Sequence, residues 1–286
     1  MSNTLICFLV VNKMEKLPQI AIESAYRTSS GDICIGYLRK EDLPNLPSSP
    51  RIKYIQLGLL GFESDSTQTY QSFSEDSFYQ IVQYKWSLLN HVLQLDYRYV
   101  IYSDTDVFWN LDPIQEIETA FAGLSRVNIQ IQSFTDSLNQ PRLCMGFVAF
   151  RNNTETRDFI HLCQERHKSD AIQMEKVGDD DVVTRLYVEL ERPNWIIELP
   201  QTTFPVGRML KLFALNSLYP GLASPTPFIF HANYVIGLKN KILLIRIFMA
   251  KYSQNSHRRK LSLVSYAVLV IKHLRHLLMR IKASFK

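Results

Sequence analysis

Two aspartates that follow a short apolar segment are the residues whose spacing most clearly suggests chemistry. Tyr99–Tyr102 is an apolar segment that favours a strand, and Ser103 leads from it to Asp104 and Asp106. In open α/β sheets, ligands bind at the carboxyl ends of the strands. Two carboxylates at that edge repel one another unless a cation or a proton lies between them. The Asp-x-Asp pair therefore predicts a site for Mg²⁺ or Mn²⁺, which prefer oxygen ligands and bind phosphate groups as well.

A structural interpretation of the same pair is that both acids lie in a solvated turn and cap the helix that starts near Pro113. A second acidic segment favours a ligand site instead. Gly178 precedes three consecutive aspartates, Asp179, Asp180 and Asp181, at the start of a helical pattern. One aspartate at a helix start is ordinary capping, but three adjacent carboxylates repel one another without a compensating charge. Capping alone therefore does not explain this segment.

A third segment combines a histidine with two lysines. Phe228–His231 is a short apolar segment, and it is followed by Gly237, Lys239 and Lys241 in the first turns of an expected helix. Helix N-termini favour bound phosphate, because their free N–H groups and the helix dipole attract anions. A single histidine at a strand end is more often structural than a ligand. Its position before a glycine and two lysines indicates a site for a phosphate-bearing molecule.

Strand-like and helix-like segments alternate along the chain. The clearest helical pattern runs from residue 77 to 95, with apolar residues at three- and four-residue spacing, and another begins at Thr154. This alternation predicts an α/β domain with a mixed, mainly parallel sheet that helices cover on both faces. The expected strands are Thr4–Val11, Asp32–Leu38, Arg51–Leu57, Tyr99–Tyr102, Val127–Ser133, Cys144–Arg151 and Trp195–Leu199.

The net charge of +5 is unevenly distributed. Glu198 is the last acidic residue, whereas residues 199–286 carry 14 of the 32 lysines and arginines. An acidic body with a basic end suggests that the end meets an anionic surface. With 46% hydrophobic and 21% charged residues, the composition is globular and excludes a disordered or fibrous chain. We divide the chain into a catalytic domain, residues 1–236, and a basic C-terminal segment, residues 237–286.

The C-terminal segment favours two helices, at 237–252 and 256–285. In the second, apolar residues from Val264 to Phe285 recur at three- and four-residue spacing among lysines and arginines. A basic amphipathic helix suits the surface of an anionic membrane. Its longest apolar run, Leu261–Ile271, is too short for a spanning helix, which needs about 20 residues. The alternatives are a helix packed on the domain with its basic side solvated, and nucleic-acid binding, which we do not expect for so apolar a segment.

The four cysteines, Cys7, Cys34, Cys144 and Cys163, are widely spaced and do not have the spacing of zinc ligands. Three of them lie in apolar segments, so we expect buried thiols rather than disulfides. The first apolar segment lacks the basic flank and the cleavage site of a secretory signal. These features predict a cytoplasmic protein that is peripheral on the cytoplasmic face of a membrane.

Several of these segments together resemble the nucleotide-diphospho-sugar transferases with the GT-A fold, particularly glycosyltransferase family 77 and the related family 8. The resemblance covers roughly residues 1–245. It depends on Lys85 in the helix before YVIYSDTDVFWNLDP, and on the segments LCMGFVAFRNN, GDDDVVTRL and FHANYVIGLKNK. It implies a single Rossmann-like GT-A domain, followed here by the basic helices.

The resemblance implies a role for each matching residue. Asp104 and Asp106 match the metal-binding Asp-x-Asp pair, and His231 matches the third protein ligand of the metal. Asp179 and Asp180 match an Asp-Gln pair beside the transferred sugar, which makes them the expected catalytic residues. The other matches concern the donor: Gly237 and Lys241 (or Lys239) for the diphosphate, Lys85 for the nucleotide, and Val11 and Asn12 for the base and ribose.

Two positions depart from the family pattern. Asp180 stands where the family usually has glutamine. Gly146 matches the glycine of a usual Asn-x-Gly motif, but Cys144 and Met145 replace its polar residues. The contacts with the acceptor therefore stay open.

The resemblance implies a metal-dependent, retaining glycosyltransferase of the hexosyltransferase class, which uses Mn²⁺ or Mg²⁺ and a nucleotide-sugar. UDP is the family's commonest carrier, and the acceptor is expected to be a glycan or a lipid-linked saccharide, as in surface polysaccharide biosynthesis. One alternative is a phosphohydrolase of the haloacid-dehalogenase type that uses Asp104 and Asp106, which leaves His231 and Lys241 unexplained. Another is a membrane-associated scaffold without turnover, which the departures at 145 and 180 would fit.

Overall fold

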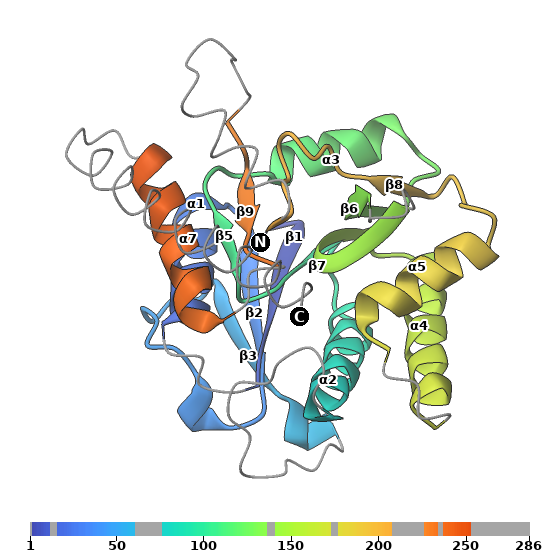
Figure 1. The fold of residues 1–286 in the computed structure, drawn as a ribbon, viewed down its shortest axis with the longest axis horizontal. Coiled ribbons are helices and arrows are strands. Elements are labelled where there is room, and N and C mark those ends of the chain that lie inside the picture. Colours follow the sequence, from blue (N-terminus) through green and yellow to red (C-terminus); the bar gives the residue numbers. More distant parts are fainter. Residues whose placement is uncertain are drawn as a thin grey trace, which may run out of the picture.

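A seven-stranded sheet with helices on both sides forms the centre of the protein (Figure 1). The computed structural model describes residues 2–11, 16–60, 76–135, 141–172, 177–207, 226–233 and 237–252. The strand order is β3-β2-β1-β4-β7-β6-β8, and neighbours are parallel except at β7, which runs antiparallel to β4 and β6. The mixed, mainly parallel sheet expected from the sequence is confirmed. The strands are β1 (Thr4–Val10), β2 (Asp32–Tyr37), β3 (Ile52–Gln56), β4 (Tyr99–Ser103), β6 (Ile129–Thr135), β7 (Pro141–Arg151) and β8 (Ile196–Glu198).

The helices form two layers that cover the sheet. The described helices are α1 (Leu17–Thr28), α2 (Asp76–Val92), α3 (Ile114–Gly123), α4 (Thr154–Ile172), α5 (Asp179–Glu189) and α7 (Leu238–Tyr252), with short 3-10 helices at Lys40–Asp42 and Leu57–Leu60. Figure 1 shows α2, α4 and α5 grouped on one side of the sheet. The core on that side includes buried residues of α2, α4 and α5, whereas the core on the other side includes residues of α1 and α3.

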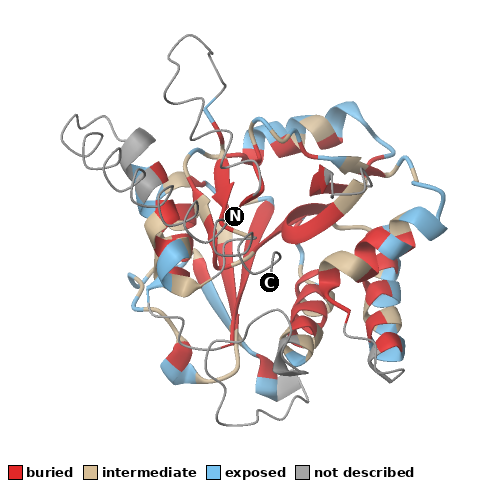
Figure 2. Cartoon of the chain, viewed as in Figure 1, coloured by how far each residue is buried: buried red, intermediate tan, exposed pale blue. Residues whose placement is uncertain are grey.

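Strand β1 is apolar along its whole length because it lies between both layers. Leu5, Cys7 and Leu9 belong to the core beneath α2, whereas Ile6, Phe8 and Val10 belong to the core beneath α1 and α3. Successive side chains of a strand point to opposite faces, so a strand covered on both faces has no polar alternation. Figure 2 shows the central strands almost entirely buried. Burial of each large apolar side chain contributes about 1.5–3 kcal/mol.

A second, two-stranded sheet joins two distant parts of the chain. Strand β5 (Val107–Trp109) pairs antiparallel with β9 (Ile229–His231), and Val107 lies opposite His231. The sequence predicted the apolar strand before His231 but not β5, which has only three residues. Helix α3 begins next to Pro113 as expected, and its first turn is capped by Asp112, whose carboxylate accepts the Ile114 N–H at 3.0 Å.

The first helix of the C-terminal segment packs on the domain. Helix α7 occupies 238–252, close to the expected 237–252, and buries Ile242, Ile245 and Phe248 against Leu17 and Phe230. The second expected helix, 256–285, lies outside the described residues. Within the part of the chain that the structure describes, no helix combines the length and the apolar character that crossing a membrane requires. The division at residue 236 stays a prediction.

The four cysteines are buried and carry free thiols, as the sequence predicted. Burial raises the pKa values of Cys7, Cys144 and Cys163 above the usual value for a thiol. These thiols therefore stay protonated and behave as small apolar groups.

Candidate functional site

Asp104 and Asp106 lie in a tight turn between β4 and β5, at the carboxyl edge of the main sheet. The Asp104 N–H donates to the Gly146 carbonyl at 2.8 Å, and the Val107 N–H donates to the Asp104 carbonyl at 3.1 Å. This turn, rather than a continued strand, brings the two carboxylates together. Asp106 is buried, whereas Asp104 is half-buried.

His231 lies beside this pair because β9 is paired with β5. Its Nε2 is 3.2 Å from Asp106 Oδ1. One ligand atom from each of Asp104, Asp106 and His231 can be chosen so that the atoms lie within 4.8 Å of one another. The structure thus brings together the three residues that the sequence analysis assigned to a metal. Whether they bind one stays a prediction.

An irregularity in β7 shapes the floor of this site. The β6–β7 register passes from Ile131 opposite Val148 to Gln132 opposite Cys144, so that Met145, Gly146 and Phe147 have no partner on β6. Bulges of this kind release backbone groups from the sheet and redirect them. Here the released Gly146 carbonyl accepts the Asp104 N–H at 2.8 Å.

Gly146 also makes room for the His231 ring beside the two carboxylates. A Cβ atom at this position would lie 2.0 Å from His231 Cε1 and 2.9 Å from Asp104 Oδ2, which no real side chain could do. Two carboxylates and an imidazole form a donor set that suits Mn²⁺ or Mg²⁺. The residues present therefore fit a divalent cation in their chemistry, and their ligand atoms lie within 4.8 Å of one another.

We expect Gly146→Ala to weaken Mn²⁺ binding about tenfold or more, because the new methyl group displaces the His231 ring that positions one donor. Overpacking should also lower the free energy of unfolding by about 1–3 kcal/mol. Calorimetric titration with Mn²⁺ and urea unfolding measure the two effects. Gly123→Ala is the matched control, since a Cβ there would meet no atom within 4 Å. Equal Mn²⁺ affinity in both variants would contradict this account of Gly146.

Lys241 supplies a positive charge next to Asp106. Its Nζ lies 2.5 Å from Asp106 Oδ2. Burial would raise the pKa of Asp106, but Lys241 and His231 outweigh burial and hold that pKa well below its usual range. Gly237 precedes α7 with φ +89°, a conformation that favours glycine. The Gly237 carbonyl accepts the Lys241 N–H at 3.1 Å, so this turn fixes where Lys241 lies.

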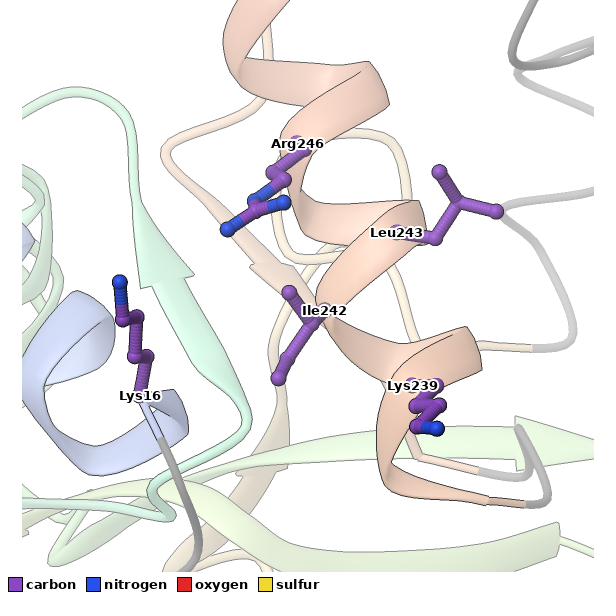
Figure 3. A pocket seen from close by; sticks show the side chains of 5 residues that line it. All are labelled: Lys16, Lys239, Ile242, Leu243 and Arg246. Carbon is purple, nitrogen blue, oxygen red and sulfur yellow. The ribbon is translucent and has the colours of Figure 1, made fainter.

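Lys239 faces a different part of the surface. It lines a groove of about 720 Å³ between the start of α1 and one side of α7, which Figure 3 shows from close by. The groove residues of α7 are spaced at three and four positions and so share one face. The lining residues are Lys16, Lys239, Ile242, Leu243 and Arg246. Of the two lysines that the sequence left open, Lys241 is the one at the Asp106 carboxylate.

The three aspartates after Gly178 have three different partners. Asp181 caps α5, because its carboxylate accepts the Gly178 N–H at 3.2 Å, and it also pairs with Arg142. Asp180 Oδ1 accepts the Met145 N–H at 2.6 Å, the second backbone group that the irregularity in β7 releases. Asp179 pairs with Lys85. Capping thus accounts for Asp181, and the other two acids face the site.

Lys85 lies beneath the carboxylates rather than open to solvent. Its ammonium group is buried, pairs with Asp179, and lies 3.4 Å from Asp104 Oδ1 and 4.3 Å from the centre of the Tyr102 ring. Burial would lower the pKa of Lys85, but Asp104 and Asp179 raise it above its usual value. Lys85 therefore links Asp104 of the candidate metal site to Asp179 of α5. A contact between Lys85 and the nucleotide stays a prediction.

Asp180 has an unusual protonation state for a carboxyl group. Burial among protein atoms and the neighbouring Asp179 raise its pKa to about 7. In the metal-free protein, Asp180 therefore keeps a proton between about pH 4 and pH 7 that the unfolded chain has lost.

We expect this difference to appear as a pH dependence of stability. Because the folded state binds more protons there, the contribution of Asp180 to the free energy of unfolding decreases as pH rises from about 4 to about 7. Asp180→Asn removes this decrease with pH. The free energy of unfolding of the variant should therefore rise relative to that of the wild type between about pH 4 and pH 7. Urea unfolding in the presence of a chelator measures it. A constant difference between pH 4 and pH 7 would show that Asp180 is already ionised.

The predicted nucleotide contacts lie partly outside the described residues. Val11 follows β1, which is parallel to β4, so it lies at the same sheet edge as Asp104. Asn12 lies outside the described residues. Two further residues touch the site and were not predicted from the sequence: Tyr102, whose hydroxyl donates to Asp104 Oδ1 at 2.9 Å, and Gln132, which contacts His231 at 2.8 Å. The sequence does not single out Gln132, because β6 (IQIQSFT) contains several polar residues, including a second glutamine.

Comparison with known proteins finds sugar transferases both among protein families and among individual proteins. A family model of nucleotide-diphospho-sugar transferases matches residues 49–245. UDP-galactose:fucoside alpha-3-galactosyltransferase of Dictyostelium discoideum is 27% identical over 193 residues, which cover 60% of this chain and only 28% of that protein.

Two solved structures share the fold at low sequence identity. Apo mouse xyloside xylosyltransferase 1 is 10% identical with a TM-score of 0.50, over 81% of this chain and 98% of that one. The glycosyltransferase GlyE of Streptococcus pneumoniae TIGR4 is 12% identical with a TM-score of 0.52, over 96% of this chain and 64% of that one. The predicted GT-A fold is confirmed by these likenesses.

Proposed function

Because the chain belongs to the nucleotide-diphospho-sugar transferase family, we propose that it is a metal-dependent, retaining hexosyltransferase that uses a UDP-sugar. The acceptor in this proposal is a glycan or a lipid-linked saccharide, as in surface polysaccharide biosynthesis. The observation that carries the proposal is the convergence of Asp104, Asp106 and His231, whose ligand atoms lie within 4.8 Å of one another. These residues come from segments far apart in the sequence, and this donor set suits Mn²⁺ or Mg²⁺.

Sugar transfer requires stabilisation of opposite charges on two sides of one carbon. The bond between the anomeric carbon and the diphosphate breaks, and its electron pair stays on the diphosphate oxygen. A new bond forms to the acceptor oxygen, and the proton of that hydroxyl passes to the departing diphosphate. When bound, the divalent cation supplies positive charge that stabilises the departing diphosphate.

The chain's own residues provide the remaining charges. Asp104, Asp106 and His231 would hold the cation, and Lys241, next to Asp106, would supply positive charge to the diphosphate. Asp180, held by the Met145 N–H at 2.6 Å, places a carboxylate where positive charge develops on the sugar. Lys85 fixes Asp179 and Asp104 relative to one another. Asp180 stands where the family usually has glutamine. In this assignment its carboxylate supplies a negative charge that a glutamine amide would lack.

A thermal-shift screen of nucleotide-sugars with and without Mn²⁺ tests this function. A ligand at a hundred times its Kd stabilises the folded protein by about 2.7 kcal/mol, which raises Tm by about 5 °C or more in a chain of this size. We expect such a shift with a UDP-sugar only when Mn²⁺ is present. Equal shifts with and without Mn²⁺, or none with any nucleotide-sugar, would contradict the proposal.

Nothing in the described geometry favours the two alternatives from the sequence. A haloacid-dehalogenase phosphohydrolase leaves the contacts of His231 and Lys241 with Asp106 unexplained, and the family match is to transferases. A scaffold without turnover is excluded if the protein hydrolyses its donor slowly when no acceptor is present, because this requires a working site.

We also propose that residues 237–286 attach the protein to the cytoplasmic face of an anionic membrane. The support is the basic amphipathic sequence at 256–285 and the groove that precedes it, where Lys16, Lys239 and Arg246 lie around the apolar Ile242 and Leu243 (Figure 3). Each basic residue near an anionic surface contributes about 1 kcal/mol. A lipid-linked acceptor would lie at the same surface.

Flotation of the full chain with vesicles tests this attachment. We expect binding to vesicles with anionic lipid, little binding to neutral vesicles, and about tenfold or more weaker binding after Lys16→Gln, Lys239→Gln and Arg246→Gln are combined. Three exposed basic residues elsewhere, Arg27, Lys40 and Lys168, changed in the same way, form the control. If both triple variants lose the same amount of vesicle binding, attachment depends on net charge alone. If the wild type does not bind anionic vesicles, the proposal is wrong.

A further inference from the structure

Gln132 is a fully buried polar side chain in β6 that lies against the metal-site histidine. Its Oε1 is 2.8 Å from His231 Nδ1, and its exposed fraction is 0%. A glutamine in this position would be costly without hydrogen bonds, because a buried unpaired amide loses its contacts with water. Its partners therefore show what it does.

The amide of Gln132 has a fixed orientation. Its Nε2 lies 3.1 Å from the Phe204 carbonyl and 3.3 Å from the Pro205 carbonyl. Carbonyl oxygens only accept hydrogen bonds, so the NH₂ group must face them and the oxygen must face His231. An amide oxygen only accepts, so His231 Nδ1 must carry the proton of this hydrogen bond.

The other ring nitrogen is the one that faces the site. His231 Nε2 lies 3.2 Å from Asp106 Oδ1, in the cluster with Asp104. Without a cation, Nε2 faces the Asp106 carboxylate. When a cation binds, a proton on Nδ1 leaves the lone pair of Nε2 for that cation, and a hydrogen bond to Nδ1 commonly fixes a histidine that binds a metal. The thiol of Cys144 is the other group near Nδ1, but it lies at 3.8 Å.

We propose that Gln132 is a positioning residue that holds His231 in the Nδ1–H form, so that Nε2 is offered to the cation. This inference rests on the proposed metal-dependent function. It gives a reason for the burial of Gln132 next to His231, and it extends the site to the carbonyls of Phe204 and Pro205. The segment around these two residues thereby affects the metal site without touching it.

Three variants distinguish the positioning of His231 by Gln132 from the packing of its side chain in the core. Gln132→Met keeps the length of the side chain but accepts no hydrogen bond, whereas Gln132→Glu still accepts from Nδ1. Gln130→Met is the matched control, because Gln130 is also buried in β6 and donates to the Ile117 carbonyl at 2.8 Å, away from His231. Circular dichroism and urea unfolding verify that each variant folds.

Two measurements on the full chain test the proposal. In calorimetry with Mn²⁺ alone, Gln132→Met should bind about 10–100-fold more weakly than the wild type, Gln132→Glu should recover most of the loss, and Gln130→Met should not change affinity. In ¹⁵N NMR with Mg²⁺, the His231 Nδ1–H signal of the wild type and of Gln132→Glu should be absent or exchange-broadened in Gln132→Met.

The outcomes distinguish this inference from the function it rests on. If the wild type binds Mn²⁺ and folded Gln132→Met binds it equally well, or if the wild-type proton is found on Nε2, the role of Gln132 is wrong and the metal site stands. If the wild type itself binds no Mn²⁺, with or without UDP, the proposed function fails instead.

Discussion

Asp106→Asn is expected to abolish metal-dependent donor binding and to lower sugar transfer at least about a thousandfold. A cation that stabilises the leaving group contributes several kcal/mol, and each 1.4 kcal/mol is about a factor of ten in rate. The substitution keeps the size of the side chain but removes the negative charge that faces both His231 and Lys241. Calorimetry of UDP binding with and without Mn²⁺, together with a transfer assay, measures the two losses.

The control for this experiment is Asp158→Asn, the same change at an exposed position of α4. Thermal unfolding verifies that Asp106→Asn folds, since Lys241 loses its ion pair with Asp106 in this variant. Unchanged Mn²⁺-dependent UDP affinity in folded Asp106→Asn would reject Asp106 as a metal ligand.

Asp180→Asn is expected to separate binding from transfer. The amide oxygen that this substitution introduces can still accept the Met145 N–H, so the backbone of the site should keep its shape. Loss of the carboxylate removes the charge opposite the developing cation, and loss of one such group costs about a hundredfold to a thousandfold in turnover. We therefore expect kcat to fall by that factor while the affinities for Mn²⁺ and UDP stay within about twofold.

Asp181→Asn provides the neighbouring control, because Asp181 caps α5 and pairs with Arg142 rather than facing the sugar. Its effect should appear mainly in stability. Turnover of Asp180→Asn close to that of the wild type would refute a catalytic role for this carboxylate.

The layered sheet could be predicted from the sequence because its signals are local. Strands such as β1 and β2 are buried on both faces, so they appear as continuous apolar segments. The positions of Asp104 and Asp106 followed from the rule that ligands bind at the carboxyl ends of strands. The family resemblance predicted that His231 lies near Asp104 and Asp106. Its physical cause is the pairing of β5 with β9. This pairing could not be predicted, because β5 has only three residues and no sequence pattern of its own.

The details of the site could not be predicted, because they depend on contacts between distant segments. The irregularity in β7 that exposes the Met145 N–H and the Gly146 carbonyl has no sequence signal beyond the glycine. The burial of Lys85 between two acids follows from the packing of α2 against β1 and of α5 against β7, the two strands on either side of β4. The choice of Lys241 over Lys239 required the helical phase of α7, since the two residues lie on different sides of that helix.

Pulsed electron paramagnetic resonance of Mn²⁺ bound to the full chain with UDP tests the metal site most directly. Electron spin-echo modulation detects a nitrogen that coordinates the ion. If Asp104, Asp106 and His231 share one cation, the wild type shows a ¹⁴N modulation that disappears in His231→Gln. Bound Mn²⁺ without any nitrogen signal in the wild type, or with the same signal in His231→Gln, would contradict the account.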